Sequence, residues 1–401
     1  DDFKRINDTL GHHAGDRVLA EFGARLRRAV RDGDLAVRLG GDEFAVLTGQ
    51  LKSPEDAELL ATRLLRELAP SITVDDVELA VRSSVGIAVY EEDGDNLDEL
   101  LRAADLAMYA AKGLGSGRWQ RYSPSSQALA ERWSTLAEDL RSGSLDEQLV
   151  LHYQPQVDAW SGQVTGFESL VRWDHHQLGL LSPGEFVPLA ERAGLMSRLT
   201  SSVLGRALRD YPMLQQIAPG SSVSVNISAR NLLGRGLVSD VARLLGEHRV
   251  PAEHLTLEVT EPAPGISPGV TETLTGLVQL GCRVSVSEFG TGSSSLMALS
   301  RYEGIRELKL DSGLVSNILG DPAAERLARA IIGTAHALDV RVVAEGVESR
   351  EIVTHLRDLG CDVLQGYYVR PPAVIDEIRH WVDGWPMQRD DRLAVPAQEL
   401  S

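Results

Sequence analysis

The chain has 401 residues, 43% of them hydrophobic and 24% charged, and a formal net charge of -18 at pH 7. These proportions are typical of a globular protein with room for two full cores, and the negative charge argues against nucleic acid as a partner, since phosphate backbones require basic surface. No run approaches the roughly 20 apolar residues that cross a bilayer and no signal peptide is visible, so we expect a cytoplasmic location.

Residues 38–47 read RLGGDEFAVL, two strand-like stretches joined by a glycine pair and two acids. Gly40 and Gly41 permit the positive φ angles of a tight hairpin. A backbone without side chains lets a phosphate approach peptide N–H groups, and acidic neighbours can hold a divalent cation. Taken alone, the tetrapeptide favours an ordinary hairpin turn with solvated charges.

The motifs around this hairpin extend the pattern over residues 1–120. DDFKRINDTLGHHAGDRVL precedes it, and SSVGIAVY and the helical ADLAMYAAK follow it. In this order they resemble the GGDEF family of diguanylate cyclases, in which two facing domains join two GTP molecules into cyclic di-GMP. The resemblance implies a nucleotidyl-cyclase-like α/β domain that works as a homodimer with Mg²⁺ (or Mn²⁺).

By this resemblance Asp42 would bind the catalytic metal, Glu43 would lie beside the reacting hydroxyl, and Gly40 and Gly41 would form the turn at the phosphates. Positioning and charge neutralisation are what phosphoryl transfer requires, and these residue types supply them.

Further GTP contacts come from outside the hairpin. The resemblance implies that Asn7 and Asp16 bind the guanine and that Lys4 and Lys112 contact phosphates. Asn7 and Asp16 fit turn caps as well, and Lys112 fits a solvated helix end.

Arg31-Asp32-Gly33-Asp34 stands just before the hairpin, at the spacing of the family's RxxD inhibitory site. There, arginine grips the product and aspartate accepts from a base. Four polar residues before a strand are also a common turn. We predict product feedback through Arg31 and Asp34.

The family has a second metal-binding Asp two positions before the residue equivalent to Asp1, on a strand that this chain lacks. The chain also starts without Met. We therefore expect a truncated piece of a longer protein that has an upstream sensory domain and is open to membrane anchoring there. Cyclase activity is assigned to that parent protein rather than to the piece.

Residues 121–145 are predicted to connect two domains through an amphipathic helix, with Leu129, Trp133, Leu136 and Leu140 at helical spacing. From 146 to 388, eight strand-like runs from LVLHYQPQV to VLQGYYV alternate with helical ones, which predicts a (β/α)₈ barrel. Residues 389–401 form a tail. Polar residues end the runs, where a barrel builds its active face: Glu168, Asn226, Glu258, Glu288, Asp311, Glu345 and Gln365.

Residues 137–385 resemble the EAL phosphodiesterases, which hydrolyse cyclic di-GMP. The motifs are YQPQ, FESLVRW, NISARNL, LEVTEP, FGTGSSSL, LKLD, VVAEGVE and QGYYVRPP, and the signature Glu-Ala-Leu appears as Glu168-Ser169-Leu170.

The EAL resemblance implies roles for residues of the expected barrel. Glu168, Asn226 and Glu258 would ligate the first metal, and Glu345 the second. Lys309 would position or activate the attacking water. Gln154 and Arg172 would contact the substrate, and Gln365 would support the attacking water. Glu261 would steady a loop.

The chain departs from the EAL pattern at Ser287-Glu288, where the family has two metal-binding Asp residues before Phe-Gly. Serine is a neutral, weak ligand that cannot bridge two cations, and Glu288 adds a methylene to a site of strict geometry. We expect weak or absent hydrolysis, with cyclic di-GMP binding retained.

Three functions remain open at this stage. The first is a cyclase with a barrel that binds but does not cleave. The second is a working phosphodiesterase with a GTP-sensing GGDEF half. The third is a receptor without catalysis. In all three the partners are GTP and cyclic di-GMP.

Cys282 and Cys361 have no ligand-like spacing, so we expect buried, reduced thiols. The pairs His12-His13 and His175-His176 are interpreted as loop or surface residues.

Overall fold

The computed structural model describes residues 3, 6, 10–49, 51, 53–74, 77–113, 117–142, 145–234, 236–260, 268–289 and 304–385. The chain divides into two compact units, Asp1–Arg141 and Ser142–Ser401, and each is treated by itself. Within the described ranges, no helix combines the length and apolar character needed to cross a membrane.

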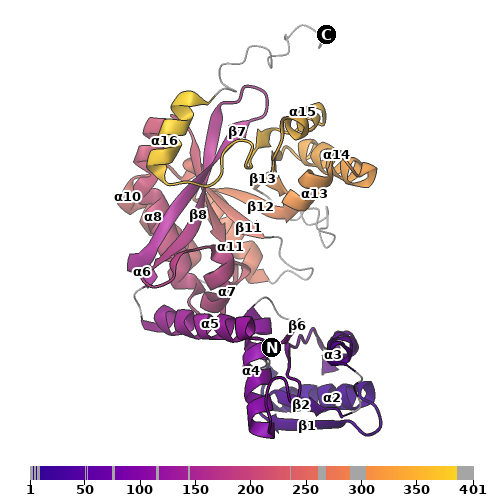
Figure 1. Ribbon diagram of the computed structural model, residues 1–401. Coiled ribbons are helices and arrows are strands. Elements are labelled where there is room, and N and C mark those ends of the chain that lie inside the picture. Colours follow the sequence, from indigo (N-terminus) through magenta and orange to yellow (C-terminus); the bar gives the residue numbers. More distant parts are fainter. Residues whose placement is uncertain are drawn as a thin grey trace. The chain divides into compact units, whose positions relative to one another are not determined.

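Unit 1 mixes helices with short paired strands (Figure 1). Among the described residues the strands pair as β1–β2 and β3–β4, both antiparallel, and β5–β6, parallel. The α/β class expected for this part is confirmed. Its elements are α2 (His12–Ala29), β1 (Leu35–Gly40), β2 (Glu43–Leu47), α3 (Pro54–Leu68), β3 (Ile72–Val74), β4 (Val77–Leu79), β5 (Val85–Ile87), α4 (Leu97–Gly113), β6 (Trp119–Arg121) and α5 (Pro124–Ser142).

The β1–β2 hairpin turns where the glycine pair predicts. Gly40 pairs with Glu43, and Gly41 takes a φ of 52°, which a residue with a side chain adopts only with strain. One hairpin face, through Phe44 and Val46, packs against buried Leu26 and neighbouring apolar residues of α2 and α3. The packed face anchors the strands and leaves the acidic turn in solvent.

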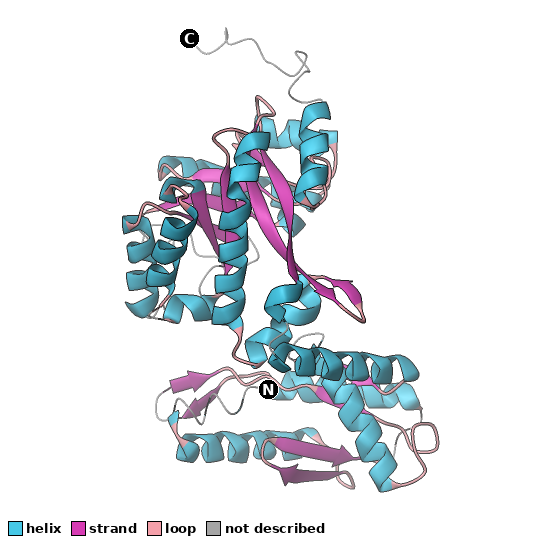
Figure 2. Ribbon diagram, turned by 90° about the vertical axis from the view of Figure 1, so that its left-hand side faces the viewer, coloured by secondary structure: helices cyan, strands magenta, loops and turns pink. Residues whose placement is uncertain are grey.

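Unit 2 is built on one sheet with helices around it (Figures 1 and 2). Its strands are β7 (Leu149–Asp158), β8 (Val164–His175), β9 (Gly179–Leu181), β10 (Ser222–Ile227), β11 (Leu255–Thr260), β12 (Arg283–Phe289), β13 (Ile305–Leu310), β14 (Arg341–Ala344) and β15 (Val363–Leu364). Its helices are α6 (Leu145–Gln148), α7 (Pro183–Arg192), α8 (Met196–Ile217), α9 (Ala229–Leu233), α10 (Leu237–His248), η1 (Ala252–His254), α11 (Pro268–Gln279), α13 (Ser312–Asn317), α14 (Pro322–Ala337), α15 (Arg350–Asp358) and α16 (Ile375–Gly384).

Pairing of β10 with β8 closes eight of these strands into the predicted barrel, and β9 extends β8 as a hairpin. The barrel differs from the expected strict alternation in one respect, because β7 runs antiparallel to both of its neighbours. Only residues 159–163 link β7 to β8. A parallel pair needs a crossover of about a dozen residues or more, so this short turn permits only an antiparallel pair.

The barrel strands are buried on both faces, and their residues alternate in kind. Val223 and Val225 of β10 are buried apolar residues, whereas Ser224 between them is buried and polar. Glu258 of β11 and Lys309 of β13 are likewise buried polar residues between buried apolar ones. Because successive side chains point to opposite faces of a strand, the polar set faces the barrel axis and the apolar set faces the helices.

Candidate functional site

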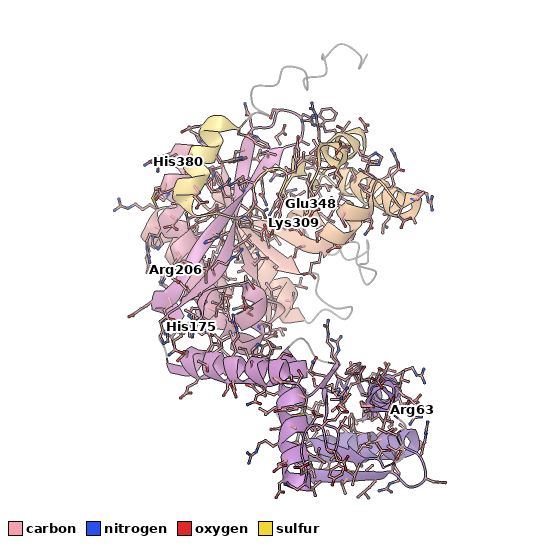
Figure 3. All side chains as sticks on the ribbon, in the orientation of Figure 1. Arg63, His175, Arg206, Lys309, Glu348 and His380 are labelled. Atoms are coloured by element: carbon pink, nitrogen blue, oxygen red, sulfur yellow. The ribbon has the colours of Figure 1, made fainter. Side chains whose placement is uncertain are left out.

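Four charged side chains from four segments of unit 2 meet inside the barrel. The ammonium group of Lys309 lies 2.8 Å from Glu168 Oε2, 2.7 Å from Glu258 Oε2 and 2.6 Å from Glu345 Oε1. Lys309 and Glu258 are fully buried and Glu345 is partly accessible. Figure 3 shows Lys309 among the barrel strands. The structure thus brings together the lysine and three acids that the sequence predicts for this site.

Burial and mutual charge set the protonation of this cluster. Burial lowers the pKa of Lys309, but the three carboxylates outweigh it and hold that pKa well above the usual value. Burial and the charge of Glu168 raise the pKa of Glu258 well above its usual range, and burial raises the pKa of Glu345. Burial raises the pKa of Glu168 too, yet the charge of Lys309 and hydrogen bonds from Lys309, Gln365 and Asn226 hold it below its usual value.

This donor set fits a divalent cation. Oxygen atoms of Glu168, Glu258 and Glu345 all lie within 4.8 Å of one another, and Asn226 Nδ2 donates to Glu168 Oε1 at 2.8 Å, which leaves the amide oxygen of Asn226 as a ligand. Among the described residues, buried Glu258 Oε1 has no hydrogen-bond partner. Carboxylate and amide oxygens are the ligands of Mg²⁺ and Mn²⁺, and an unpartnered buried carboxylate oxygen is what a cation would satisfy.

Polar side chains flank the cluster. Gln365 Nε2 donates to Glu168 Oε2 at 2.5 Å and to Gln154 Oε1 at 3.0 Å. Arg172, on β8, is half-buried, and its Nη1 donates to the carbonyl oxygen of Val171 at 2.8 Å. Gln365 and Gln154 therefore touch the acidic cluster or its direct partners.

The two departing positions at the end of β12 lie differently. Ser287 is buried, in register with Thr260 of β11, whereas Glu288 is exposed and has a φ of 58°. In the part of the chain that the structure describes, Glu168, Glu258 and Glu345 lie closely enough together to share one cation, and Glu288 does not belong to this group. Asp311 caps helix α13, since its side chain accepts from Gly313 N at 2.9 Å.

In unit 1 the predicted GTP residues lie on separate elements. Asp42 and Glu43 are exposed at the hairpin turn, Asp16 is exposed on α2, and Lys112 is half-buried in the last turn of α4. Lys4, Asn7 and Glu261 lie outside the described residues.

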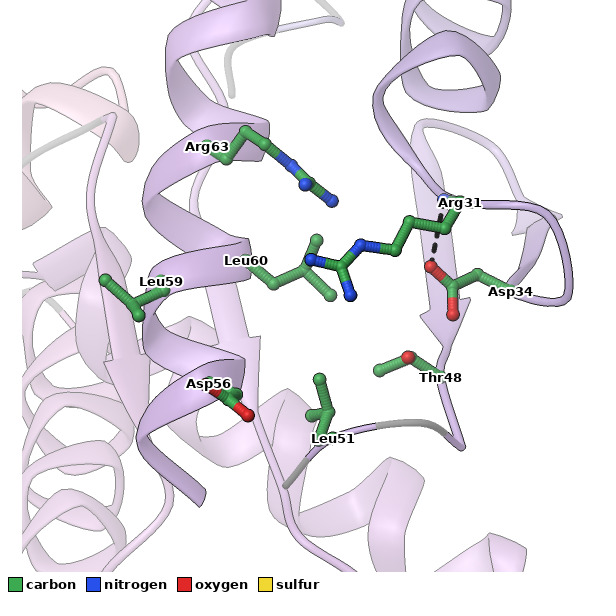
Figure 4. Close-up of a pocket in the computed structure, with 8 residues that line it drawn as sticks. All are labelled: Arg31, Asp34, Thr48, Leu51, Asp56, Leu59, Leu60 and Arg63. Atoms are coloured by element: carbon green, nitrogen blue, oxygen red, sulfur yellow. Dashed lines mark hydrogen bonds between the residues drawn. The ribbon is translucent and has the colours of Figure 1, made fainter. Parts of the chain in front are cut away.

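The RxxD residues line a cavity of ≈ 390 Å³ with Thr48, Leu51, Asp56, Leu59, Leu60 and Arg63 (Figure 4). Arg31 and Arg63 extend toward each other across it, from the turn after α2 and from α3. Asp34 accepts from the backbone N–H of Arg31 at 3.0 Å. Hydrogen bonds from Thr48 and from Arg31 lower the pKa of Asp34, so it is a carboxylate at neutral pH.

Two residues of these sites escaped the sequence analysis. Arg63 is separated from the RxxD motif by two strands, and only the fold places it opposite Arg31. Gln156 donates to Gln365 Oε1 at 2.9 Å. Its signal was its place two residues after Gln154, on the same face of β7.

One histidine pair was interpreted wrongly in part. His175 is buried at the end of β8, where its ring packs against Trp173 and its Nδ1 accepts from the backbone N–H groups of Gln177 and Leu178. Hydrogen bonding by one ring nitrogen explains how a histidine on a polar turn becomes buried. Both cysteines are buried and free, as predicted.

Comparison with protein families finds two domains in this chain. The family described as EAL domain matches residues 137–372, and the family described as diguanylate cyclase, GGDEF domain, matches residues 1–118.

Curated relatives match along almost the whole chain. The bifunctional diguanylate cyclase/cyclic di-GMP phosphodiesterase MucR of Pseudomonas aeruginosa is 38% identical over 94% of this chain and 55% of its own length. The cyclic di-GMP phosphodiesterase PdeR of Escherichia coli is 33% identical over 95% of this chain and 57% of its own length. The chain therefore spans about half the length of the curated relatives that it matches.

Among solved structures, the PaMucR phosphodiesterase in complex with c-di-GMP superposes with a TM-score of 0.58 at 37% identity. The match covers 61% of this chain and 99% of that one.

Proposed function

The chain belongs to the proteins of cyclic di-GMP signalling that join a GGDEF domain to an EAL domain, and on this premise we propose that its EAL barrel binds cyclic di-GMP with little or no hydrolysis. In a longer protein, of the full length of the curated relatives, the GGDEF domain makes the same nucleotide from GTP. The barrel then serves as a sensor next to the synthetic domain.

This proposal rests on the difference between Glu258, whose carboxylate can bind a cation, and Ser287, which is neutral at a position where the family has a metal-binding Asp. Glu168, Glu258, Glu345 and Asn226 supply oxygen ligands for one divalent cation. Two-metal hydrolysis requires a bridging anionic ligand to hold the cations about 3.5–4 Å apart. Ser287 offers a neutral hydroxyl, and the neighbouring Glu288 is exposed and outside the carboxylate group. One cation with Gln154 and Arg172 is sufficient to hold a phosphate diester, but a second cation would lack its anionic bridging ligand.

The test is nucleotide turnover with Mg²⁺ or Mn²⁺, with GTP in one reaction and cyclic di-GMP in another. We expect product from GTP in the longer protein and no cleavage of cyclic di-GMP. The double substitution Ser287→Asp with Glu288→Asp should create hydrolysis, and Glu345→Gln on that background should remove it. Rapid cleavage by the unaltered chain would refute the proposal.

The proposed synthetic role rests on the β1–β2 hairpin. The turn places Asp42 and Glu43 in solvent next to two glycine backbones, which is the arrangement that a metal-bound triphosphate needs. The bound cation would supply charge neutralisation, while Asp42 would hold it and Glu43 would face the reacting hydroxyl. Two such domains must face each other, so a homodimer is part of this proposal.

We assign product feedback to the cavity lined by Arg31, Asp34 and Arg63. The cavity offers two guanidinium groups and the carboxylates of Asp34 and Asp56, which suit a ligand with phosphates and guanine edges. Arg31→Ala and Arg63→Ala should each raise the concentration of cyclic di-GMP that halves cyclase activity by tenfold or more. Arg66→Ala, an exposed arginine on the same helix, is the control. Unchanged inhibition in both variants would exclude this site.

A working phosphodiesterase is the alternative, and one observation favours it. The relatives MucR and PdeR carry phosphodiesterase in their names. In that case Glu288 would rotate into the site and complete the metal set. Cleavage that disappears in Glu288→Gln would establish this alternative.

A further inference from the structure

Three hydrogen bonds hold the side-chain amide of Gln365 in one orientation. Its Nε2 donates to Glu168 Oε2 (2.5 Å) and to Gln154 Oε1 (3.0 Å), and its Oε1 accepts from Gln156 Nε2 (2.9 Å). The four side chains are at most 7% exposed. No amide hydrogen of Gln365 is left over for another partner.

The direction of this chain of amides follows from two groups that only accept. Glu168 is a carboxylate, so Gln365 must present its nitrogen there and its oxygen to the opposite side. The carbonyl oxygen of Arg370 accepts from Gln154 Nε2 at 3.1 Å, which turns the oxygen of Gln154 toward Gln365. Gln156 is the donor that completes the set at Gln365 Oε1.

We propose that Gln156 is a positioning residue of the EAL site. By donating to Gln365, it keeps both N–H groups of Gln365 on Glu168 and Gln154. It thereby couples a residue proposed to bind the metal with a residue proposed to bind the nucleotide. This inference rests on the proposed binding of cyclic di-GMP, and it adds a residue that does not touch the ligand.

The backbone explains why Gln156 reaches this place. Val157 of β7 pairs with Leu364 of the antiparallel strand β15, so Gln156 lies opposite Gln365. On the other side Gln156 pairs with Gly166 of β8. A Cβ atom at Gly166 would lie 2.8 Å from Gln156 Oε1 and 2.9 Å from Ser222 Oγ, so the glycine provides space for both of these side chains.

The experiment is a double-mutant cycle with Gln156→Met, Gln365→Met and the double variant in the full chain. Methionine keeps the length of glutamine and removes the donor. Titration calorimetry with cyclic di-GMP and Mg²⁺ gives the affinities, and urea unfolding of the free protein gives the coupling without ligand. Gln163→Met, at an exposed position in the turn between β7 and β8, is the matched control.

We expect Gln156→Met to weaken cyclic di-GMP binding about tenfold, which is 1.4 kcal/mol, and to have no further effect when Gln365 is already Met. Equal losses in both backgrounds would show that Gln156 acts by another route and would overturn the inference. If the unaltered chain binds no cyclic di-GMP, the proposed function fails. The unfolding cycle then decides alone, because additive losses would overturn the coupling and non-additive losses would support it.

A second variant approaches the same contact from the other strand. Gly166→Ala keeps every hydrogen-bonding group of the three glutamines, but its Cβ atom would push Gln156 Oε1 aside together with Ser222 Oγ. It should reproduce the loss of affinity seen in Gln156→Met, and it should add nothing to Gln156→Met. Full affinity in Gly166→Ala, in a protein that unfolds at the usual urea concentration, would contradict the positioning role.

Discussion

Lys309 supplies the positive charge that the buried carboxylates of Glu168 and Glu258 share with the partly accessible Glu345. Removing one partner of a buried ion pair leaves uncompensated charge, which costs about 3–5 kcal/mol. We expect Lys309→Met to lose stability of that order in EDTA, because Glu168, Glu258 and Glu345 then face one another without a cation. Urea unfolding followed by circular dichroism measures the loss. Added Mg²⁺ or Mn²⁺ should restore part of it, since the ion takes over the role of the ammonium group.

Lys112→Met is the control for this substitution, because Lys112 lies on helix α4 of unit 1. Divalent cations should stabilise the Lys309→Met barrel more than the barrel of the control. Equal stabilisation in both would mean that the carboxylates do not form a cation site.

At Thr256, also in the barrel interior, we expect a substitution to have the opposite effect on stability from Lys309→Met. Its hydroxyl is buried and, within the described residues, has no hydrogen-bond partner. Thr256→Val keeps the shape and removes the unsatisfied group, so we expect stability to be unchanged or to rise by about 1 kcal/mol. Urea unfolding checks the sign. A loss above about 1 kcal/mol would show that the hydroxyl is hydrogen-bonded to internal water.

At the scale of elements, Gly86 of β5 determines how closely helix α4 approaches its strand. A Cβ atom there would lie 1.8 Å from Ala104 O and 2.4 Å from Met108 N, both in the backbone of α4. A helix backbone cannot yield as a side chain does, so Gly86→Ala should destabilise unit 1 by about 3 kcal/mol or more. Because α4 carries Lys112, GTP binding should weaken as well.

Gly49→Ala is the matched control in the same unit, since a Cβ atom there meets nothing within 4 Å. Thermal unfolding and a fluorescent GTP analogue give the two readouts. If Gly86→Ala unfolds at the same temperature as the control, strand β5 and helix α4 are not held together as the structure has them.

Elements that depend on local pattern were predictable, and those that depend on pairing were not. Alternation along the chain predicted a barrel, and polar residues at strand ends predicted the acids that meet Lys309. The antiparallel course of β7 follows from a connection of five residues, 159–163, which the alternation of strands and helices obscured. Asp311 shows what local pattern cannot decide. The sequence grouped it with the polar residues at the strand ends, but in the structure it caps helix α13. Arg63 and Gln156 gain their partners only through the fold.

For the whole molecule, two compact units with separate cores imply two unfolding events. The apolar clusters around Val18, Leu26 and Ala61 belong to unit 1, and the barrel strands form their own core. A cooperative transition extends as far as a shared core does, so calorimetry should resolve two transitions. Gly86→Ala should lower one midpoint, and Lys309→Met should lower the other.

Ligands should separate the same two transitions. Cyclic di-GMP at 100 times its dissociation constant stabilises the domain that binds it by about 2.7 kcal/mol. With the RxxD cavity disabled by Arg31→Ala, we expect that increase in the barrel transition alone. In the unaltered chain both transitions should rise, because the cavity of unit 1 and the site of unit 2 are proposed to bind the same nucleotide. A single transition whose midpoint moves with every variant and ligand would instead mean that the two units unfold together. Ligand binding to one unit would then change the stability of the other.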